Sequence, residues 1–300
     1  MATFVIAEAA SSWRFGPDHL ANAFRLITAA KACDASAFKV QWTSDPALMA
    51  KRRHGAAEDF EILAYPFEWL EKLKAECDRV QIEFMTTVFI PADIAKIAPL
   101  VKRFKVASAE SSDEEFVKAH FAYSQRVIVS HAFGTVPDYR WYGETDPETK
   151  ATLPLADKFL HCVCSYPTPI EQANLKRVGF HKGVIFHGLS DHTTSVLTGA
   201  LAVAAGASVI EKHVRLHDTP MENPDFPHSL TADCRCTPNE IAVMREAWNF
   251  RRTDELLPEH KAGCFAEYVA NIREAELAMG HGRNEAMECE KANEGRRVKA

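Results

Sequence analysis

The sequence predicts an α/β fold, specifically a (β/α)8 TIM barrel, from three observations. The chain has 300 residues, an ordinary length for a barrel built as one domain. Short β-rich runs alternate with longer helical patterns, and this alternation indicates βαβ units and a parallel sheet. Eight such units follow one another without repeats or linkers, which favours a closed barrel. A doubly wound open sheet has the same periodicity and is the competing topology.

Each predicted strand is a short run rich in β-branched and aromatic residues. The eight runs are Thr3–Ala7, Phe38–Gln41, Gln81–Met85, Phe104–Ala107, Val127–Val129, Phe159–Val163, Val184–His187 and Ser208–Lys212. Helical patterns follow most of them, at Pro17–Cys33, Pro66–Cys77, Pro91–Val101, Asp113–Ala122, Pro169–Arg177, Thr193–Gly206 and Asn239–Asn249. Several of these helices begin with proline, whose missing N–H is harmless in the first turn.

Two stretches do not fit the repeating unit. The segment Phe133–Thr152 is rich in proline, glycine and aromatic residues, and it replaces the expected fifth helix with a long loop. Beyond Gly263 a last helix is expected to run to about Met279. We therefore expect the barrel to occupy residues 1–280 and a polar tail to occupy residues 281–300.

Composition limits the class of function. The formal net charge of −6 argues against nucleic acid as a partner, because phosphate backbones select basic surfaces. No run approaches the roughly 18 apolar residues of a membrane helix, and the N-terminus carries no basic leader, so we expect a cytoplasmic protein without a membrane partner. Eight scattered cysteines indicate reduced thiols, and the spacing of Cys162/Cys164 and Cys234/Cys236 suits a zinc site poorly.

Polar and ionisable residues stand at or just after nearly every predicted strand, where a barrel places its active site. They are Glu8, Lys39, Gln41, Thr87, Lys105, Ser108, Glu110, Ser130, His161, Tyr166, Ser190, Asp191, His192, Glu211 and His213. A barrel with structural roles alone has little reason to bring so many ionisable side chains to one rim. The pattern therefore predicts an enzyme.

Two lysines in this set indicate an anionic ligand. Lys39 and Lys105 lie on predicted strands, and a lysine that points into a barrel is costly unless it meets an anion. A phosphate or carboxylate would satisfy both. The alternative is that each lysine simply pairs with a glutamate. The same ligand oxygens can accept hydrogen bonds from the hydroxyls of Ser108, Ser130 and Ser190.

Two histidines predict a metal site. His192 and His213 end consecutive predicted strands, so their imidazoles should lie side by side, and Glu211 shares a strand face with His213. Two histidines with open positions suit a divalent transition metal such as Mn, Zn or Co that also binds substrate oxygen. The alternative is a pair of hydrogen-bonded core histidines. Other rim candidates without a clear role are His131, His187, His217 and His228.

Several segments resemble the N-acetylneuraminate (sialic acid) synthases. They are Phe104–Glu110, Leu160–Pro169, Gly188–Thr193, Gly206–His213, Asn223–Asp225 and His228–Thr231. The resemblance runs from about Phe4 to Thr231, with the motifs in order. It implies a TIM barrel, phosphoenolpyruvate as one substrate and a divalent metal of the Mn²⁺ type, with Mg²⁺ or Co²⁺ as alternatives.

The resemblance also implies roles for single residues. By their match to the family, His192 and His213 are the metal ligands. The residues it implies as catalytic are Glu8, Lys39, Glu110, Glu211 and Asp225. The residues it implies for substrate binding are Gln41, Thr87, Lys105, Ser108, Ser130, Tyr166 and Ser190.

The implied reaction condenses phosphoenolpyruvate with an N-acyl aminosugar aldehyde and releases phosphate. In the family a C-terminal antifreeze-like domain reaches across a dimer and contributes an arginine to the sugar's N-acyl group. We expect no such domain here, because too few residues follow Thr231, and no oligomeric state is predicted. We therefore expect an altered acceptor sugar. Residues that could replace the missing arginine are Trp13, Arg14, Arg140, Trp141 and Tyr142.

Two alternatives stay open. A related phosphoenolpyruvate-dependent synthase could act on a phosphorylated sugar, with Arg14 and Lys51–Arg53 as its basic cluster, although such loop charges are more often simply solvated. A non-catalytic relative could bind sugar only. The expected absence of the antifreeze-like domain favours that relative, whereas the retained lysines, histidines and acids argue against it.

Overall fold

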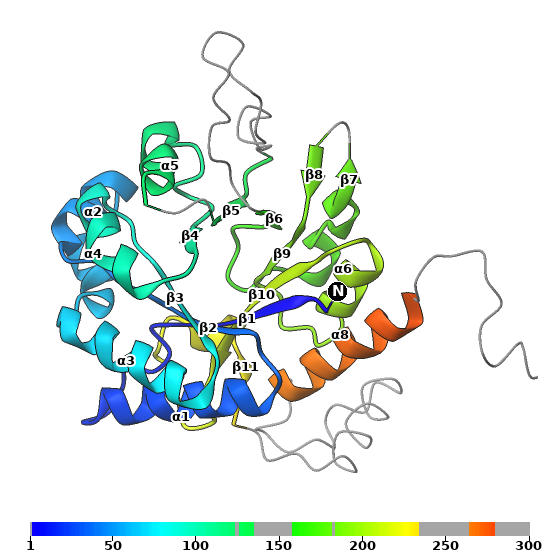
Figure 1. The fold of residues 1–300 in the computed structure, drawn as a ribbon, viewed down its shortest axis with the longest axis horizontal. Coiled ribbons are helices and arrows are strands. Elements are labelled where there is room, and N and C mark those ends of the chain that lie inside the picture. Colours follow the sequence, from blue (N-terminus) through cyan, green and yellow to red (C-terminus); the bar gives the residue numbers. More distant parts are fainter. Residues whose placement is uncertain (1, 124–125, 135–157, 182–183, 234–263, 280–300) are drawn as a thin grey trace, which may run out of the picture.

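Eight parallel strands close into a barrel in the computed structural model, which describes residues 2–123, 126–134, 158–181, 184–233 and 264–279 (Figure 1). The strands are β1 (Phe4–Ala10), β2 (Ala37–Gln41), β3 (Glu83–Thr87), β4 (Phe104–Val106), β5 (Val127–His131), β6 (Lys158–Cys162), β9 (Gly188–Asp191) and β10 (Val209–Arg215). They pair in chain order, and β10 pairs with β1 from Phe4↔Val209 to Glu8↔His213. That closing pair confirms the predicted (β/α)8 barrel and rules out the open sheet.

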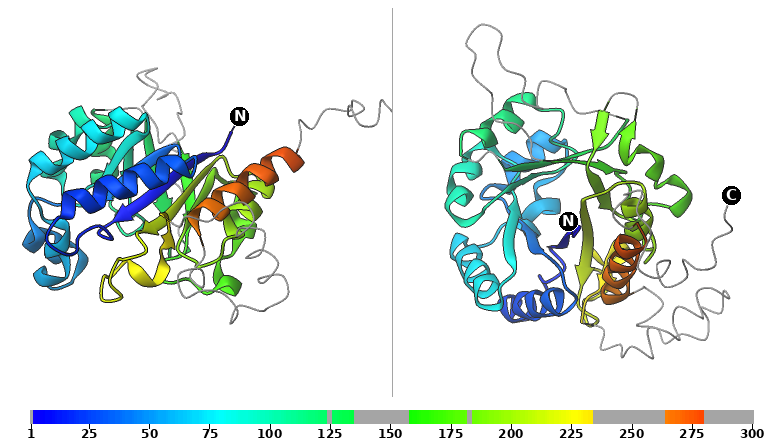
Figure 2. Two further views of the ribbon diagram at one scale, coloured as in Figure 1. Left: turned by 90° about the horizontal axis from the view of Figure 1, so that it is seen from below. Right: turned by 45° about the vertical axis from the view of Figure 1, so that its right-hand side comes forward.

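Helices surround the barrel on its outer side (Figure 2). The α-helices are α1 (His19–Ala32), α2 (Pro46–Arg53), α3 (Phe67–Val80), α4 (Pro91–Ile97), α5 (Glu114–Phe121), α6 (Thr198–Ala204) and α8 (Phe265–Met279). Asp18, Asp45 and Asp113 cap α1, α2 and α5, each side chain accepting from a backbone N–H of the first turn. None of the helices within the described ranges is long and apolar enough to cross a membrane.

Short elements complete the wall. The 3₁₀-helices are η1 (Ala57–Leu63), η2 (Ala98–Leu100), η4 (Ile170–Gln172), η5 (Leu175–Arg177) and η6 (Phe226–His228). The strand β11 (Leu230–Thr231) pairs with the end of β10. Helix α2 and 3₁₀-helix η1, which lie between β2 and α3, were not predicted from the sequence, because neither is long enough to show a clear helical period.

The inside of the barrel changes from apolar to polar along the strands. The lower layer is a small apolar cluster of Ile6, Ala37, Met85, Ile128, Leu160 and Val209, all buried. Successive strand residues alternate between the two faces, so the residues two positions further on also point inward. Those residues are Glu8, Lys39, Thr87, Ser130, Cys162 and Glu211. The apolar layer therefore closes the bottom of the barrel, and the polar layer above it is the floor of a site.

The predicted seventh strand, Val184–His187, was wrong. Val184–Phe186 forms β8, which pairs antiparallel with β7 (Gly179–His181) in a separate hairpin, and the barrel strand is β9. The Val-Ile-Phe run has the stronger β-pattern, whereas Gly188-Leu-Ser-Asp191 has the composition of a loop. Gly188 permits this strand to pair closely, because a Cβ there would lie 1.8 Å from the carbonyl oxygen of Val209.

The predicted helix Pro169–Arg177 was also wrong. The segment forms two 3₁₀ turns, η4 and η5, and Asn174 between them has a φ of 49°, a left-handed conformation that an α-helix cannot contain. Some predictions lie outside the described residues. These are the helix Asn239–Asn249, most of the segment Phe133–Thr152, the pair Cys234/Cys236 and the tail 281–300.

Candidate active site

The floor of the site is a chain of alternating buried charges. The Lys39 ammonium forms an ion pair with Glu8 and lies 3.1 Å from Oε1 of Glu211. The other carboxylate oxygen of Glu211 lies 3.2 Å from Nζ of Lys105. Lys39 also donates a hydrogen bond of 2.9 Å to Thr87. The lysine–glutamate pairing that the sequence left open is thus present, and it holds both lysines inside the barrel.

Burial and neighbouring charges shift the pKa values of Glu8 and Glu211 in opposite directions. Burial raises the pKa of Glu8 to about 7, although Lys39 opposes the shift. Burial acts on Glu211 in the same sense, but Lys105 and Lys39 outweigh it and hold its pKa far below the usual value. Burial would lower the pKa of Lys39, yet its two carboxylate neighbours keep it raised. Glu211 is therefore a fixed negative charge, and Glu8 is the group that can exchange a proton near neutral pH.

Three cavities open above this floor. A narrow one of about 40 Å³ is lined by Lys39, Gln41, Thr87, Lys105, Ser108, Ser130, Tyr166, Ser190, His192, Glu211 and His213. A wider one of about 280 Å³ shares Gln41, Ser108, Tyr166 and His213 with it and adds Asp225. A third of about 640 Å³ contains Glu110. The structure thus gathers most of the sequence-predicted residues around cavities that share lining residues, with Glu8 buried behind Lys39. His161 and Asp191 line none of the three cavities: His161 contacts the Ala173 carbonyl oxygen, and Asp191 pairs with Lys212.

One hydroxyl in the narrow cavity lacks a partner. Oγ of Ser130 is buried, and it makes no hydrogen bond within the described part of the chain. A buried hydroxyl without a partner is costly. Ser130 lies in the same cavity as the ammonium groups of Lys39 and Lys105. An anionic oxygen placed there would satisfy the hydroxyl and meet the two positive charges together.

Three donor atoms converge at the wider cavity. Nδ1 of His213 lies 3.2 Å from Oδ1 of Asp225 and 3.2 Å from Nε2 of His228, and Nε2 of His228 lies 3.4 Å from the same Asp225 oxygen. All three side chains are buried. Burial, with His228 nearby, lowers the pKa of His213 to about 4, so this imidazole is neutral at pH 7. Imidazole nitrogens beside a carboxylate are a donor set that suits a divalent transition metal.

His192 lies beside this group. The centroid of its ring is 5.3 Å from that of His213, so the two imidazoles are neighbours. Nδ1 of His192 lies 2.9 Å from the carbonyl oxygen of Val163, and Tyr166 packs on the ring at a centroid distance of 4.2 Å. Burial lowers the pKa of His192 to about 3. The backbone contact orients the ring and leaves Nε2 as its available lone pair.

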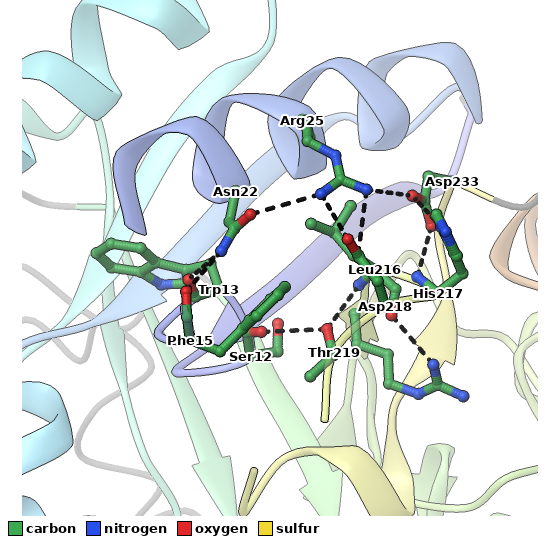
Figure 3. A network of polar contacts seen from close by, with 11 residues as sticks. Ser12, Trp13, Phe15, Asn22, Arg25, Leu216, His217, Asp218, Thr219 and Asp233 are labelled. Carbon is green, nitrogen blue, oxygen red and sulfur yellow. Dashed lines mark hydrogen bonds and ion pairs between the residues drawn. The ribbon is translucent and has the colours of Figure 1, made fainter. Parts of the chain in front are cut away.

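The loop that carries Asp225 and His228 is anchored to the first strand–helix unit (Figure 3). On α1, Arg25 pairs with Asp218 at 2.9 Å and with Asp233 at 3.3 Å. Thr219 donates a hydrogen bond of 3.3 Å to the carbonyl oxygen of Ser12. These contacts join the segment after β1 to the segment after β10. They fix both ends of the loop that carries Asp225 and His228.

Glu110 does not stand alone at the rim. Arg53, the last residue of α2, donates from Nε and Nη2 to its two carboxylate oxygens, each at 2.7 Å. The guanidinium also lies over the ring of Phe89, 4.7 Å from its centroid. Arg53 lines both the 280 Å³ and the 640 Å³ cavities. Arg52 also lines the 640 Å³ cavity, but Arg53 is the arginine that pairs with Glu110.

The arginine expected from the first loop has a different position. Arg14 lies against the rings of Trp13, Tyr65 and Trp69 at 5.2–5.6 Å and donates to the carbonyl oxygen of Ile62 at 3.2 Å. Trp13 is fully buried. Neither side chain lines the three cavities. The other proposed replacements lie outside the described residues and are Arg140, Trp141 and Tyr142.

Sequence reasoning missed Ser11 and did not predict the contacts of two further residues of this site. His228 was a rim candidate without a clear role, and Arg53 was named only as part of the basic cluster Lys51–Arg53. Ser11 donates to Asp225 from its backbone N–H at 2.8 Å and from its hydroxyl at 2.5 Å. Only for His228 was there a usable signal, namely a second polar residue three positions after Asp225. Ser11 and Arg53 act from loops and helix ends, where no periodicity reports which way a side chain points.

A parallel barrel with buried charged residues around cavities at the carboxyl ends of its strands is the arrangement of (β/α)8 enzymes. The sequence profile of the NeuB family matches residues 26–248, and the chain belongs to this family. It is 32% identical over 252 residues to a pseudaminic acid synthase of Campylobacter jejuni, covering 77% of this chain and 70% of that protein.

A second relative is an N,N'-diacetyllegionaminic acid synthase of Legionella pneumophila, 29% identical over 274 residues, covering 82% of this chain and 72% of the relative. The fold also matches the crystal structure of an N-acetylneuraminic acid (sialic acid) synthetase from Leptospira borgpetersenii in complex with citrate. That match has a TM-score of 0.73 at 22% identity and covers 99% of this chain and 92% of the other. The protein is therefore a sugar acid synthase-like member of the NeuB family.

Proposed function

We propose that this protein condenses phosphoenolpyruvate with an N-acyl aminosugar aldehyde and releases phosphate, forming a nonulosonic acid. The observation that supports it most is the narrow cavity itself. It combines two buried lysines with an unpartnered serine hydroxyl, and it adjoins the histidines and acids of the wider cavity. Pseudaminic and legionaminic acid synthases among the relatives support the same reaction class. Phosphoenolpyruvate is a cytoplasmic metabolite, so we place the enzyme in the cytoplasm.

Phosphoenolpyruvate would bind with its anionic groups at the narrow cavity and with the rest of the molecule in the wider cavity, which shares lining residues with it. Lys105 and Lys39 would meet its carboxylate and phosphate, and hydroxyls of Ser108, Ser130 and Ser190 would donate to the remaining oxygens. Both lysines are paired with glutamates without the substrate. Binding an anion favours protonation of a nearby acid, and Glu8 is the acid whose pKa, about 7, makes that proton uptake easy. By taking up a proton, Glu8 would lower the negative charge of the floor when the anionic substrate binds.

The acceptor sugar would lie in the wider cavity, between Arg53 and the histidines, with Glu110 beside Arg53 in the neighbouring 640 Å³ cavity. The new bond joins C3 of phosphoenolpyruvate to the aldehyde carbon, water adds at C2, and phosphate leaves from C2. Glu110 would orient the sugar and the water through its carboxylate, and Tyr166 would cover the reacting groups from the rim. Fixing both substrates in this way contributes mainly by positioning.

A divalent cation, of the Mn²⁺ type by resemblance, would be held beside His192 and His213. When bound, such an ion polarises a carbonyl oxygen as a Lewis acid. The fit rests on the donor set, because the buried imidazoles are neutral and a carboxylate from Asp225 lies within 3.2 Å of His213. Glu211, two residues before His213, adds a fixed negative charge on the same strand face.

The test is phosphate release from phosphoenolpyruvate by protein stripped of metal and reloaded with Mn²⁺. A panel of N-acyl aminosugars is compared with their phosphorylated forms, and the product is identified by mass spectrometry. We expect release that needs both the metal and one sugar, and that is lost in Lys105→Ala. Release only with phosphorylated sugars would favour the sugar phosphate synthase. No release with any sugar, although sugars bind, would overturn the proposal in favour of a sugar-binding relative.

A further inference from the structure

We propose that a divalent transition metal binds to His213, Asp225 and His228, so that His228 is a metal ligand that the sequence did not predict. The catalytic meaning of this site rests on the proposed function. Its existence does not, because metal binding can be measured without any substrate.

The three ligand atoms form an almost equilateral triangle. Its sides are 3.2 Å from His213 Nδ1 to Asp225 Oδ1, 3.2 Å from His213 Nδ1 to His228 Nε2, and 3.4 Å from His228 Nε2 to Asp225 Oδ1. Metal–nitrogen and metal–oxygen bonds are roughly 2.0–2.2 Å, which puts neighbouring donors of a tetrahedral or octahedral ion roughly 3.0–3.5 Å apart. The triangle therefore already has the spacing of three ligands on one face of an ion.

Hydrogen bonding alone satisfies this triangle poorly. One of its sides joins two imidazole nitrogens, which can share at most one proton between them. The other ring nitrogen of His228, Nδ1, is buried and has no hydrogen-bond partner among the residues that the structure describes. A cation at the centre would use the lone pairs of both facing nitrogens and the negative charge of Asp225 together.

Hydrogen bonds from Ser11 orient the carboxylate of Asp225 toward the two imidazoles. Its second oxygen, Oδ2, accepts from the N–H of Ser11 at 2.8 Å and from the Ser11 hydroxyl at 2.5 Å. Asn223 in turn donates to the Ser11 carbonyl oxygen at 3.1 Å. Hydrogen bonds of this kind orient metal ligands and tune their basicity. Oδ1 is left free to face the two imidazoles.

The triangle lies on the wall of the 280 Å³ cavity, which all three residues line. The remaining positions of a bound ion would therefore face the space in which we place the sugar. A second group of possible ligands, His217, Asp218 and Asp233, differs in this respect. It is largely exposed, and Arg25 already pairs with both of its carboxylates (Figure 3). A cation has no comparable reason to bind there.

The two-histidine site expected from the sequence makes a different prediction. His192 contacts the Val163 carbonyl oxygen and Tyr166, and its ring centroid is 6.3 Å from that of His228, against 4.5 Å between His213 and His228. If His192 and His213 held the ion alone, His228 would be dispensable for affinity. If the triangle holds it, His228 is essential for tight binding.

The experiment is titration of chelator-treated protein with Co²⁺ and Mn²⁺, followed by calorimetry and by the visible spectrum of Co²⁺. We expect His228→Ala to weaken Co²⁺ binding at least about tenfold and to change the spectrum. The matched control is His217→Ala, a histidine of the exposed group, which should bind as the unmodified protein does. Thermal melting of each variant checks that it is folded.

A second variant, His228→Cys, keeps the test decisive if His228→Ala does not fold. In His228→Cys, a thiolate bound to Co²⁺ would produce an intense near-ultraviolet charge-transfer band that a structural histidine cannot explain. Unchanged affinity and spectrum in His228→Ala, with no such band in His228→Cys, would overturn the inference. Tight metal binding through His228 without phosphate release would support the metal site. It would count only against the proposed reaction.

Discussion

The guanidinium of Arg53 holds both carboxylate oxygens of Glu110 at 2.7 Å, across 57 residues of sequence. Glu110 is only 5% exposed, and burial would lower the pKa of Arg53 but Glu110 keeps it raised. Two of the five N–H donors of Arg53 are used, and the others have no hydrogen-bond partner within the described ranges. A sugar hydroxyl can accept from such a guanidinium and donate to the carboxylate beside it. Because the charges of Arg53 and Glu110 cancel, the pair suits an uncharged part of the acceptor sugar.

We expect Arg53→Ala to impair acceptor binding selectively. Loss of the guanidinium removes hydrogen-bond donors from the wider cavity and leaves Glu110 as a buried, unpaired charge, which costs about 3–5 kcal/mol when it happens to a buried pair. The KM for the sugar should rise at least about tenfold, whereas the KM for phosphoenolpyruvate should hardly change. Steady-state kinetics with each substrate varied in turn measure both values.

Arg79→Ala is the matched control, because Arg79 forms a similar two-point contact with Glu76 on the exposed face of α3. It should leave both KM values unchanged. Equal loss of affinity for both substrates in Arg53→Ala would mean that the residue holds the fold of the rim rather than the sugar.

Lys39→Met should strongly destabilise the protein. The substitution removes the cation between two buried carboxylates, Glu8 and Glu211, and leaving a buried charge without its partner costs about 3–5 kcal/mol. Adding Glu8→Gln should restore little of that loss at pH 7, because Glu8, whose pKa is about 7 beside Lys39, takes up a proton once that cation is removed, and Glu211 is the carboxylate that stays charged. The free energy of unfolding in urea, measured for both single variants and the double variant, gives the coupling.

An exposed ion pair provides the control for the stability loss in Lys39→Met. Lys74 pairs with Asp78 on the surface of α3, so Lys74→Met should cost less than about 1 kcal/mol. A cost for Lys39→Met no larger than that for Lys74→Met would show that solvent reaches the floor of the barrel and screens its charges.

His120 should make the protein less stable in mild acid. Burial lowers the pKa of this α5 histidine to about 4, although its hydrogen bond to the Phe116 carbonyl opposes the shift. The unfolded chain has a histidine pKa near 6.5, so between these values it binds more protons than the folded chain. The stability that His120 contributes is complete above about pH 6.5 and is lost as the pH falls toward 4, with about 2 kcal/mol gone at pH 5.

His120→Gln, which does not titrate, should therefore lose less stability than the unmodified protein between pH 7.5 and about pH 5. The difference between the two proteins, measured by urea unfolding at each pH, isolates this residue from the other buried histidines. Parallel pH profiles for both proteins would indicate that His120 takes up its proton as readily in the folded chain as in the unfolded chain.

Cys164 should be the site thiol that alkylating reagents reach. It is half-buried on the wall of the 280 Å³ cavity, whereas Cys162 is buried and burial raises its pKa to about 12. Because the thiolate is the reactive form, Cys162 should stay unmodified. Peptide mass spectrometry after brief iodoacetamide treatment should find the label on Cys164, with loss of sugar binding. Cys164→Ser should resist the loss, and inactivation of that variant at an equal rate would place the sensitive thiol elsewhere.

Much of the floor of the site could be predicted from alternation along the strands. Lys39, Glu211 and His213 lie on strands whose apolar pattern determines which face points inward, and the structure has them inside the barrel. The pattern failed at Val184–His187, where an apolar run belongs to a separate two-stranded hairpin, and at Pro169–Arg177, where a left-handed Asn174 lies between two 3₁₀ turns. In both cases a local preference was overruled by the contacts of neighbouring segments.

The sequence by itself therefore determined the parallel strand–helix units and the inward polar layer, because both follow from periodicity that each strand carries within itself, whereas the pairing of β10 with β1 decided that the sheet closes. Tertiary structure decided the pairs that complete the site. Arg53 meets Glu110, and His228 meets His213, only because the closed barrel brings the loops after different strands to one rim. No local pattern encodes such contacts, since loop conformation depends on what the loop packs against, as the anchoring of the β10 loop to Ser11 and Arg25 illustrates.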